Sequence, residues 1–405
     1  AIVLYFSAEW IVLKFLAEDP FLINIIQFYA FTLPFTVTTL IASFATQGFK
    51  ILKYKIFVNQ IINPAVLLVS MIASYLIFGP KIAILIPTFL SAFIGMIFIL
   101  FFLKKFIALD LKKFISTPFN TKILKFSIPL MFVSAIGIIM HWTDILMLGI
   151  FSDASAVGKY HPIERTAGLI RMILFAFAGI FAPLFSQYFH ENNSEKMKEI
   201  YQLSTKWIFV GCLPLFIFLM LFSNPMLMLF GNEFDNGLAL KILSVGIMIQ
   251  AFFGLGSSSL TMSGFSNINL LNVLAALTIN IIMNIILIPQ YGIIGAASAT
   301  TSALFFISFL RFFENYYILN LNVFSSKLFK PLLSGFLTVL TIFLLQRYVL
   351  NLLDYSSSLL NLILYLLVGI SLIFIGYFSF YALLGIDKED KDMIDSLKHK
   401  ISNQA

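Results

Sequence analysis

The residues best suited to chemistry in this sequence are a few charged side chains that interrupt otherwise apolar stretches. His141 and Asp144 are three residues apart, so they share one face if their stretch is helical. Glu164 and Arg171 follow a helical spacing that places opposite charges on one face of the next stretch. A buried carboxylate can hold hydroxyl groups or a cation, and a guanidinium suits phosphate. Both are costly in an apolar setting unless they face protein or water.

Membrane-spanning helices are expected to hold these charged groups in place. The chain has 405 residues, of which 60% are hydrophobic and only 11% are charged, far outside the soluble range. A span needs roughly 20 apolar residues, so the composition allows about a dozen spans and leaves no room for an appended catalytic domain. We therefore expect an all-α polytopic membrane protein. Twelve candidate spans lie at about 1–16, 21–45, 56–78, 82–103, 126–151, 163–186, 204–222, 238–260, 268–289, 293–313, 328–346 and 359–384.

The basic residues indicate how these spans are oriented. Most of the 26 Lys and Arg residues, Lys206 and Arg311 among them, fall in one set of alternating loops or at span ends next to them. Such an excess marks the cytoplasmic side and predicts a cytoplasmic C-terminus. It also explains the net charge of +7 without nucleic acid. The tail from Asp387 onward is expected to be a short, solvated surface helix.

Two sequence features predict how the spans are arranged. The segment 43–50 has a weak counterpart at 259–266, six predicted spans later, as two parallel six-helix bundles require. Pro289, Gly292 and Gly295 predict a tight turn between two spans, followed by small residues that favour close helix packing.

Amide side chains form a long polar stripe on the predicted span 268–289. Asn272, Asn280 and Asn284, together with Asn269, fall within about 60° of one another on a helix. Such a stripe lines a wet cavity or makes hydrogen bonds between helices, and both interpretations stay open. Gln250 is a weaker signal of the same kind.

Two motifs resemble a known family. The segments 144–151 and 157–160 are similar to the seventh-span signature of polysaccharide flippases in the multidrug/oligosaccharidyl-lipid/polysaccharide exporter superfamily. Asn280 and Asn284, followed by 288–300, resemble the eleventh-to-twelfth-span junction of the same family.

The resemblance implies an architecture of about fourteen helices in the intact protein, with two bundles plus two C-terminal helices. Residue 1 then aligns with the start of the third span, so about two spans would precede it. The expected domains are an incomplete N-terminal bundle at 1–110, the second six-helix bundle at 111–325, two additional helices at 326–384, and a cytoplasmic tail at 385–405.

The resemblance also implies a function. It predicts a flippase of the bacterial cytoplasmic membrane that moves polyprenyl-diphosphate-linked oligosaccharide by alternating access, for surface polysaccharide such as O-antigen. Expected partners are this substrate, membrane lipid, a polysaccharide polymerase and glycosyltransferases, without a cofactor. Candidate cavity residues are Asp144, Arg171, His141, Lys159, Arg165, Asn272, Asn280, Asn284 and Gln250. Proton or sodium coupling would use Asp144 or Glu9.

Other functions remain as alternatives. A peptidoglycan-precursor flippase and a cation-coupled multidrug exporter belong to the same superfamily, although the asparagine stripe argues mildly against a drug cavity. A polymerase or ligase of lipid-linked glycans would be expected to have a larger outer loop than this chain provides. An ATPase is disfavoured because the sequence has no phosphate-binding glycine loop ending in Gly-Lys-Ser/Thr. The four histidines and Cys212 lack metal-ligand spacing.

Overall fold

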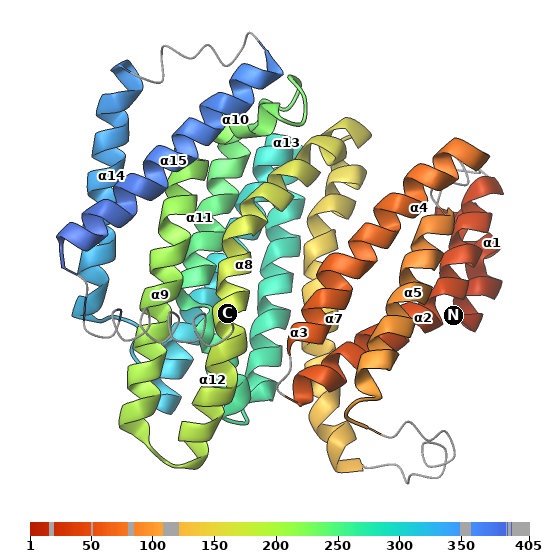
Figure 1. Cartoon of the computed structure of the whole chain (residues 1–405), viewed down its shortest axis with the longest axis horizontal. Coiled ribbons are helices and arrows are strands. Elements are labelled where there is room, and N and C mark those ends of the chain that lie inside the picture. Colours follow the sequence, from red (N-terminus) through yellow and green to blue (C-terminus); the bar gives the residue numbers. More distant parts are fainter. Residues whose placement is uncertain are drawn as a thin grey trace. The chain divides into compact units, whose positions relative to one another are not determined.

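The protein is a bundle-forming helical membrane protein. The computed structural model describes residues 1–15, 20–49, 52–79, 85–107, 121–348 and 358–385, together with Asp387 and Asp390. Within these ranges all regular structure is helical (Figure 1). Ten of the described helices are long and apolar enough to cross a membrane. These helices confirm the predicted all-α polytopic class. Helices suit membrane spans because they satisfy their own backbone polar groups in lipid. The number of twelve spans and the parallel repeat stay predictions.

The chain forms two compact units, Ala1–Phe119 and Asn120–Ala405. The first unit contains α1 (Ile2–Phe15), α2 (Pro20–Gly48), α3 (Leu52–Ile56), a π-helix (Phe57–Ile62), α4 (Asn63–Phe78) and α5 (Leu85–Leu103). Its packing is rich in aromatic contacts between α2 and α5: Phe35 meets the edge of Phe89 at 5.5 Å between ring centroids. Such edge-to-face pairs add to the apolar packing.

The second unit holds the larger core. Its helices are α7 (Thr121–Phe151), α8 (Ala154–His190), α9 (Ser194–Leu221), α10 (Ser223–Met228), α11 (Gly237–Phe253), α12 (Leu255–Met262), α13 (Ser266–Leu319), a 3-10 turn (Ser326–Leu328), α14 (Phe329–Tyr348) and α15 (Leu359–Leu383). Side-chain caps mark where several begin. The Asp153 carboxylate accepts a hydrogen bond from the Ala156 N–H at the start of α8, and Asn193 and Ser358 cap α9 and α15.

Helix α13 is folded into a hairpin at Gly292. This residue has φ 53° and ψ −124°, a conformation open to glycine but strained for other residues. Asn280 Nδ2 donates to Thr300 Oγ1 at 3.1 Å, so side chains on the two sides of Gly292 meet in an antiparallel pair. The turn expected after Pro289 is therefore confirmed. Residues 266–291 are called the first arm below, and residues 293–319 the second arm.

Two basic residues assigned to loops or interfaces in the sequence analysis are buried in helices instead. Lys206 lies within α9 and is fully buried, and Arg311 lies within the second arm at 8% exposure. Sequence position was misleading because both lie near the end of an apolar run, where such side chains usually extend to water. Each is instead held by polar partners distant in the sequence.

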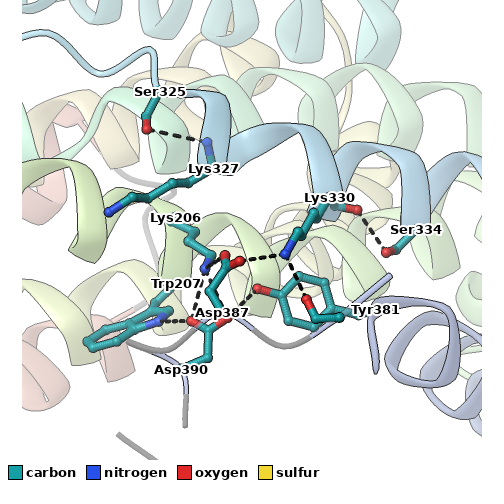
Figure 2. Close-up of polar contacts among 10 residues, drawn as sticks. Lys206, Trp207, Ser325, Lys327, Lys330, Ser334, Tyr381, Asp387 and Asp390 are labelled. Atoms are coloured by element: carbon teal, nitrogen blue, oxygen red, sulfur yellow. Dashed lines mark hydrogen bonds and ion pairs between the residues drawn. The ribbon is translucent and has the colours of Figure 1, made fainter. Parts of the chain in front are cut away.

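The start of the tail also differs from expectation. Asp390 was expected to be solvated but is buried, and it accepts hydrogen bonds from Lys206 Nζ at 2.9 Å and from Tyr381 Oη at 2.8 Å (Figure 2). Asp387 accepts from Lys206 Nζ at 2.6 Å. The remainder of the predicted tail lies outside the described residues.

The close approach of the two arms yields a test. A Cβ at Gly295 would collide with the backbone carbonyl of Leu287 in the first arm, whereas a Cβ at Gly179 of α8 would meet nothing within 4 Å. We expect Gly295→Ala to lower the free energy of unfolding by about 1–3 kcal/mol, as overpacking typically does. Gly179→Ala is the matched control and should be neutral or slightly stabilising. Thermal unfolding of both purified variants checks this; equal midpoints would contradict the close packing of the arms.

Candidate functional site

An internal cavity lies within the second unit. Its volume is about 670 Å³, within the range of pockets for small ligands and headgroups. Its walls come from α7, α8, α11, α12 and both arms of α13, and most are apolar. The charged and strongly polar groups that line it include Asp144, Glu164, Arg171, Gln250, Thr300 and Arg311. Two carboxylates and two guanidiniums thus share one cavity among the described residues.

Asp144 is the most densely bonded group on the cavity. Its buried carboxylate accepts hydrogen bonds from Asn284 Nδ2 at 2.8 Å, Asn280 Nδ2 at 3.0 Å and Tyr160 Oη at 3.0 Å. The hydroxyl of Thr300 donates to the same carboxylate. Three helices, α7, α8 and α13, therefore converge on one side chain. We call Asp144, Tyr160, Asn280, Asn284 and Thr300 the Asp144 cluster.

The Asp144 cluster contains many oxygen atoms. Asn284 Oδ1 is buried and has no hydrogen-bond partner within the described part of the chain. Carboxylate, amide and hydroxyl oxygens are the ligands preferred by hard cations. A buried orphan acceptor beside a carboxylate is also where a proton or cation would be most strongly stabilised. The chemistry of this cluster is therefore compatible with reversible cation or proton binding.

Arg171 brings positive charge to the cavity from α8. Its Nε donates to Gln250 Oε1 at 3.1 Å, which joins α8 to α11. Glu164 lies seven residues earlier on the same face of α8, and its Oε1 is 4.0 Å from Arg171 Nη1. The predicted common face of these two residues is thus confirmed. The Arg171 side chain keeps 26% exposure, so it can contact a ligand while Gln250 holds it.

Arg311 is the second guanidinium on the cavity. Its Nη2 donates to Asn269 Oδ1 at 3.0 Å, and in turn Asn269 bonds Ser257 of α12. The buried Nε of Arg311 has no hydrogen-bond partner in the described structure. Arg311 therefore adds a positive charge to the cavity wall, and a guanidinium there suits a bound anion. Sequence reasoning missed this role, although the spacing of Arg311 and Asn269 about Gly292 was a signal that could have found it.

The other proposed site residues lie in different surroundings. Asn272 is buried and donates to Glu314 across the hairpin. Lys159 and Arg165 lie on α8 but do not belong to the residues described as lining the cavity. Glu9 lies in the first unit with an exposed side chain, and the His141 side chain lies outside the described residues. Their roles stay predictions.

Of the two interpretations of the asparagine stripe, hydrogen bonding between helices matches the structure, since none of the four asparagines is among the residues that line the cavity. Its members bond across the hairpin or between helices, as Asn280 does with Thr300 and Asp144. The groups they bond, Asp144 and Arg311, themselves line the cavity. The stripe thus lies behind the charged groups and orients them.

The fold and the cavity define a multi-pass membrane protein with a charged internal chamber. Comparison with known families shows to which family this membrane protein belongs. The model of the polysaccharide biosynthesis protein family matches residues 1–239, more than half of the chain. The chain therefore belongs to this family, which confirms the resemblance seen in its motifs.

Curated relatives give the same grouping. The chain is 28% identical over 171 residues to a probable low-salt glycan biosynthesis flippase of Haloferax volcanii, a match that covers 42% of this chain and 36% of the relative. It is 30% identical over 221 residues to the capsular polysaccharide biosynthesis protein CapF of Staphylococcus aureus, which covers 49% of this chain and 53% of CapF. The matches thus span from about a third to about half of the relatives' length.

Two solved structures share the fold. One is the lipid II flippase MurJ in an inward closed conformation, with a TM-score of 0.66, 16% identity and coverage of 95% of this chain and 80% of MurJ. The other is a mutant of a MATE protein, with a TM-score of 0.64, 16% identity and coverage of 79% and 74%. At this identity the likeness concerns the fold alone.

The Asp144 cluster can be tested by a matched pair of threonine substitutions. Thr300 donates to Asp144, whereas the exposed Thr278 on the first arm donates only to the Leu274 carbonyl among its described bonds. Thr300→Val should lower the free energy of unfolding by about 1.5–3 kcal/mol, the range for a hydrogen bond to a charged group. Thr278→Val should stay within about 0.5 kcal/mol of the parent. Similar losses in the two variants, measured by thermal unfolding, would show that Asp144 does not depend on Thr300.

Proposed function

We propose that the protein is a flippase that moves a polyprenyl-diphosphate-linked oligosaccharide across the membrane by alternating access, in the biosynthesis of surface polysaccharide. The observation that carries this proposal is a cavity of about 670 Å³ lined by both Arg171 and Arg311. Membership of the polysaccharide biosynthesis protein family supports the substrate class. The flippase names of relatives and the fold likeness to MurJ support the reaction.

The proposed substrate is both anionic and rich in hydroxyl groups, and the cavity offers partners for each. The guanidiniums of Arg171 and Arg311 would bind phosphate oxygens. Gln250 and Ser257 would hydrogen-bond sugar hydroxyls from α11 and α12. Lys159, Arg165 and His141 remain proposed contributors to headgroup binding. The prenyl chain would stay in lipid, because only the headgroup is costly to transfer through hydrocarbon.

Direction would come from coupling to an ion. The Asp144 cluster is the proposed coupling site, since it joins a carboxylate, two amides and two hydroxyls in one buried place. A proton would bind the carboxylate alone, whereas sodium would use the surrounding oxygens as well. Either occupant would neutralise Asp144 and change how α7, α8 and α13 hold together. Glu9 is a second proposed coupling carboxylate.

A multidrug exporter is the second candidate function. The observation that favours it is the fold likeness to the MATE protein, together with the largely apolar cavity walls. A peptidoglycan-precursor flippase is a variant of the first proposal, supported by the fold likeness to MurJ. Arg171 and Arg311 would bind an anionic headgroup, whereas Asp144 and Glu164 in the same cavity would suit a cationic drug, so the two candidates predict different consequences for loss of the arginines.

The cellular setting is also proposed. The protein would reside in the bacterial cytoplasmic membrane with a cytoplasmic C-terminus, as the distribution of Lys and Arg indicates. It would receive substrate from glycosyltransferases and deliver it to a polysaccharide polymerase. The divisions 1–110, 111–325, 326–384 and 385–405 remain the proposed domains.

The arginines can be tested in cells that lack the full-length gene and carry plasmid copies. Arg171→Gln and Arg311→Gln should each reduce surface polysaccharide about tenfold or more, because a lost charge-assisted hydrogen bond to phosphate weakens binding by roughly 1.5–3 kcal/mol. Intact lipid-linked oligosaccharide should accumulate, and its mass would identify the glycan. Lys198→Gln, an exposed position on α9, is the control at equal expression. An unchanged lipid-linked pool with greater sensitivity to cationic drugs would instead favour the exporter.

The coupling role of Asp144 can be tested in proteoliposomes that contain the purified full-length protein. Transport of the lipid-linked oligosaccharide should depend on an imposed sodium or proton gradient, and the effective gradient identifies the ion. Asp144→Asn should abolish that dependence and slow net transport about tenfold or more, because the neutral amide no longer offers a charge to the cation. Asp235→Asn, at an exposed loop position, is the matched control. Unaltered ion dependence in the Asp144 variant would refute this role.

A further inference from the structure

A second polar cluster lies in the same unit, where the chain leaves α15. Its members are Lys206 and Trp207 of α9, Lys330 of α14, Tyr381 of α15, and Asp387 and Asp390 (Figure 2). We call these six residues the tail cluster. None of them lines the cavity described above, so the proposed function leaves this cluster unexplained.

The tail cluster is built around a buried ammonium group. Lys206 Nζ donates to Asp387 Oδ2 at 2.6 Å and to both oxygens of Asp390 at 3.0 and 2.9 Å. Lys330 Nζ donates to Asp387 and, at 2.8 Å, to the Gly385 carbonyl. Two lysines and two aspartates balance in charge, which such a buried group requires.

The carboxylates stay ionised at ordinary pH. Burial alone would raise the pKa of Asp390, but hydrogen bonds from Lys206, Trp207 and Tyr381 outweigh it and lower this pKa below its usual value. The pKa of Asp387 is lowered for the same reason by Lys206 and Lys330. The ion pairs are therefore formed throughout the neutral range.

Trp207 extends the cluster toward the cavity. Its Nε1 donates to Asp390 Oδ1 at 3.0 Å, and its ring lies 6.4 Å from the ring of Phe177 on α8. Phe177 lies next to Ala178 in the sequence and two residues after Phe175, and both of these residues line the cavity. A contiguous set of contacts thus runs from the tail to the helix that carries Arg171.

We propose that Asp387 and Asp390 form an intramolecular latch, in which Asp390 docks on Lys206 and Trp207 and so holds the C-terminal half of α8 in its place on the cavity wall. Release must open Lys206 to water, because a buried ammonium left without its counterions would be strongly destabilising. Asp387 and Lys330 are partly exposed, so water can reach them when the segment leaves. Release of the latch would free α8 to move, whatever the cavity carries.

Cysteine labelling of the purified full-length protein tests the latch. With Cys212 replaced by alanine, a single cysteine is introduced either at Ala178 on α8 or at Val133 on α7, and both positions line the cavity. Asp390→Asn should raise the rate of maleimide labelling at position 178 about tenfold, since labelling follows the population of the open segment. The rate at position 133 should change little. No substrate is required, so this result is independent of the proposed transport function.

Two further variants separate a latch from a structural support. Asp390→Glu keeps the charge and should restore slow labelling at position 178, and Glu199→Gln, an exposed carboxylate on α9, should have no effect. Equal acceleration at both reporter positions would indicate general loosening of the fold and would overturn the latch. Unchanged labelling at both positions in Asp390→Asn would overturn it as well, because α8 would then be held without the tail.

Discussion

The need to satisfy the buried carboxylate of Asp144 constrains the whole second unit. A lone carboxylate in an apolar interior is prohibitively costly, so each of its donors must be delivered to within hydrogen-bonding distance. Tyr160 comes from α8, Asn280 and Asn284 from the first arm of α13, and Thr300 from the second arm. These bonds set the depth of α7 against its neighbours and the register of the hairpin. A shift of one helical turn in any of these elements would leave a charge unpaired.

The hairpin of α13 is the scaffold that makes this arrangement possible. Its turn at Gly292 places the two arms side by side and so forms two polar layers at different distances from the turn, one at Asp144 and one where Asn269 bonds Arg311. The first layer provides a negative charge and the second a positive charge within one cavity. This separation of charge along one hairpin allows the cavity to hold a cation near one layer and an anion near the other. Ion coupling and substrate binding would then act on the same pair of arms.

The same electrostatic rule operates at the tail cluster, with a different consequence. Lys206 is as deeply buried as Asp144, yet its counterions come from a short segment at the end of a helix instead of from helices packed on all sides. Charges held by packed helices stay in place as long as the unit is folded. In the proposed latch, Asp387 and Asp390 lie beyond the end of α15 and can leave while the helices stay packed. The fold thus combines a permanent polar centre with a releasable one, and Trp207 connects the second to α8.

The protein class, the extent of most membrane helices and the break at Gly292 could all be inferred from the amino-acid sequence. These features follow from local pattern, because lipid requires long apolar helices and glycine permits the turn. It also placed the asparagine stripe on one helical face, where the structure has it. The burial of Arg311 and Lys206 and the bond by which Gln250 orients Arg171 depend on how the helices pack. Their partners are distant in sequence, and a single charged residue near a span end has the same local pattern whether it reaches water or a buried counterion.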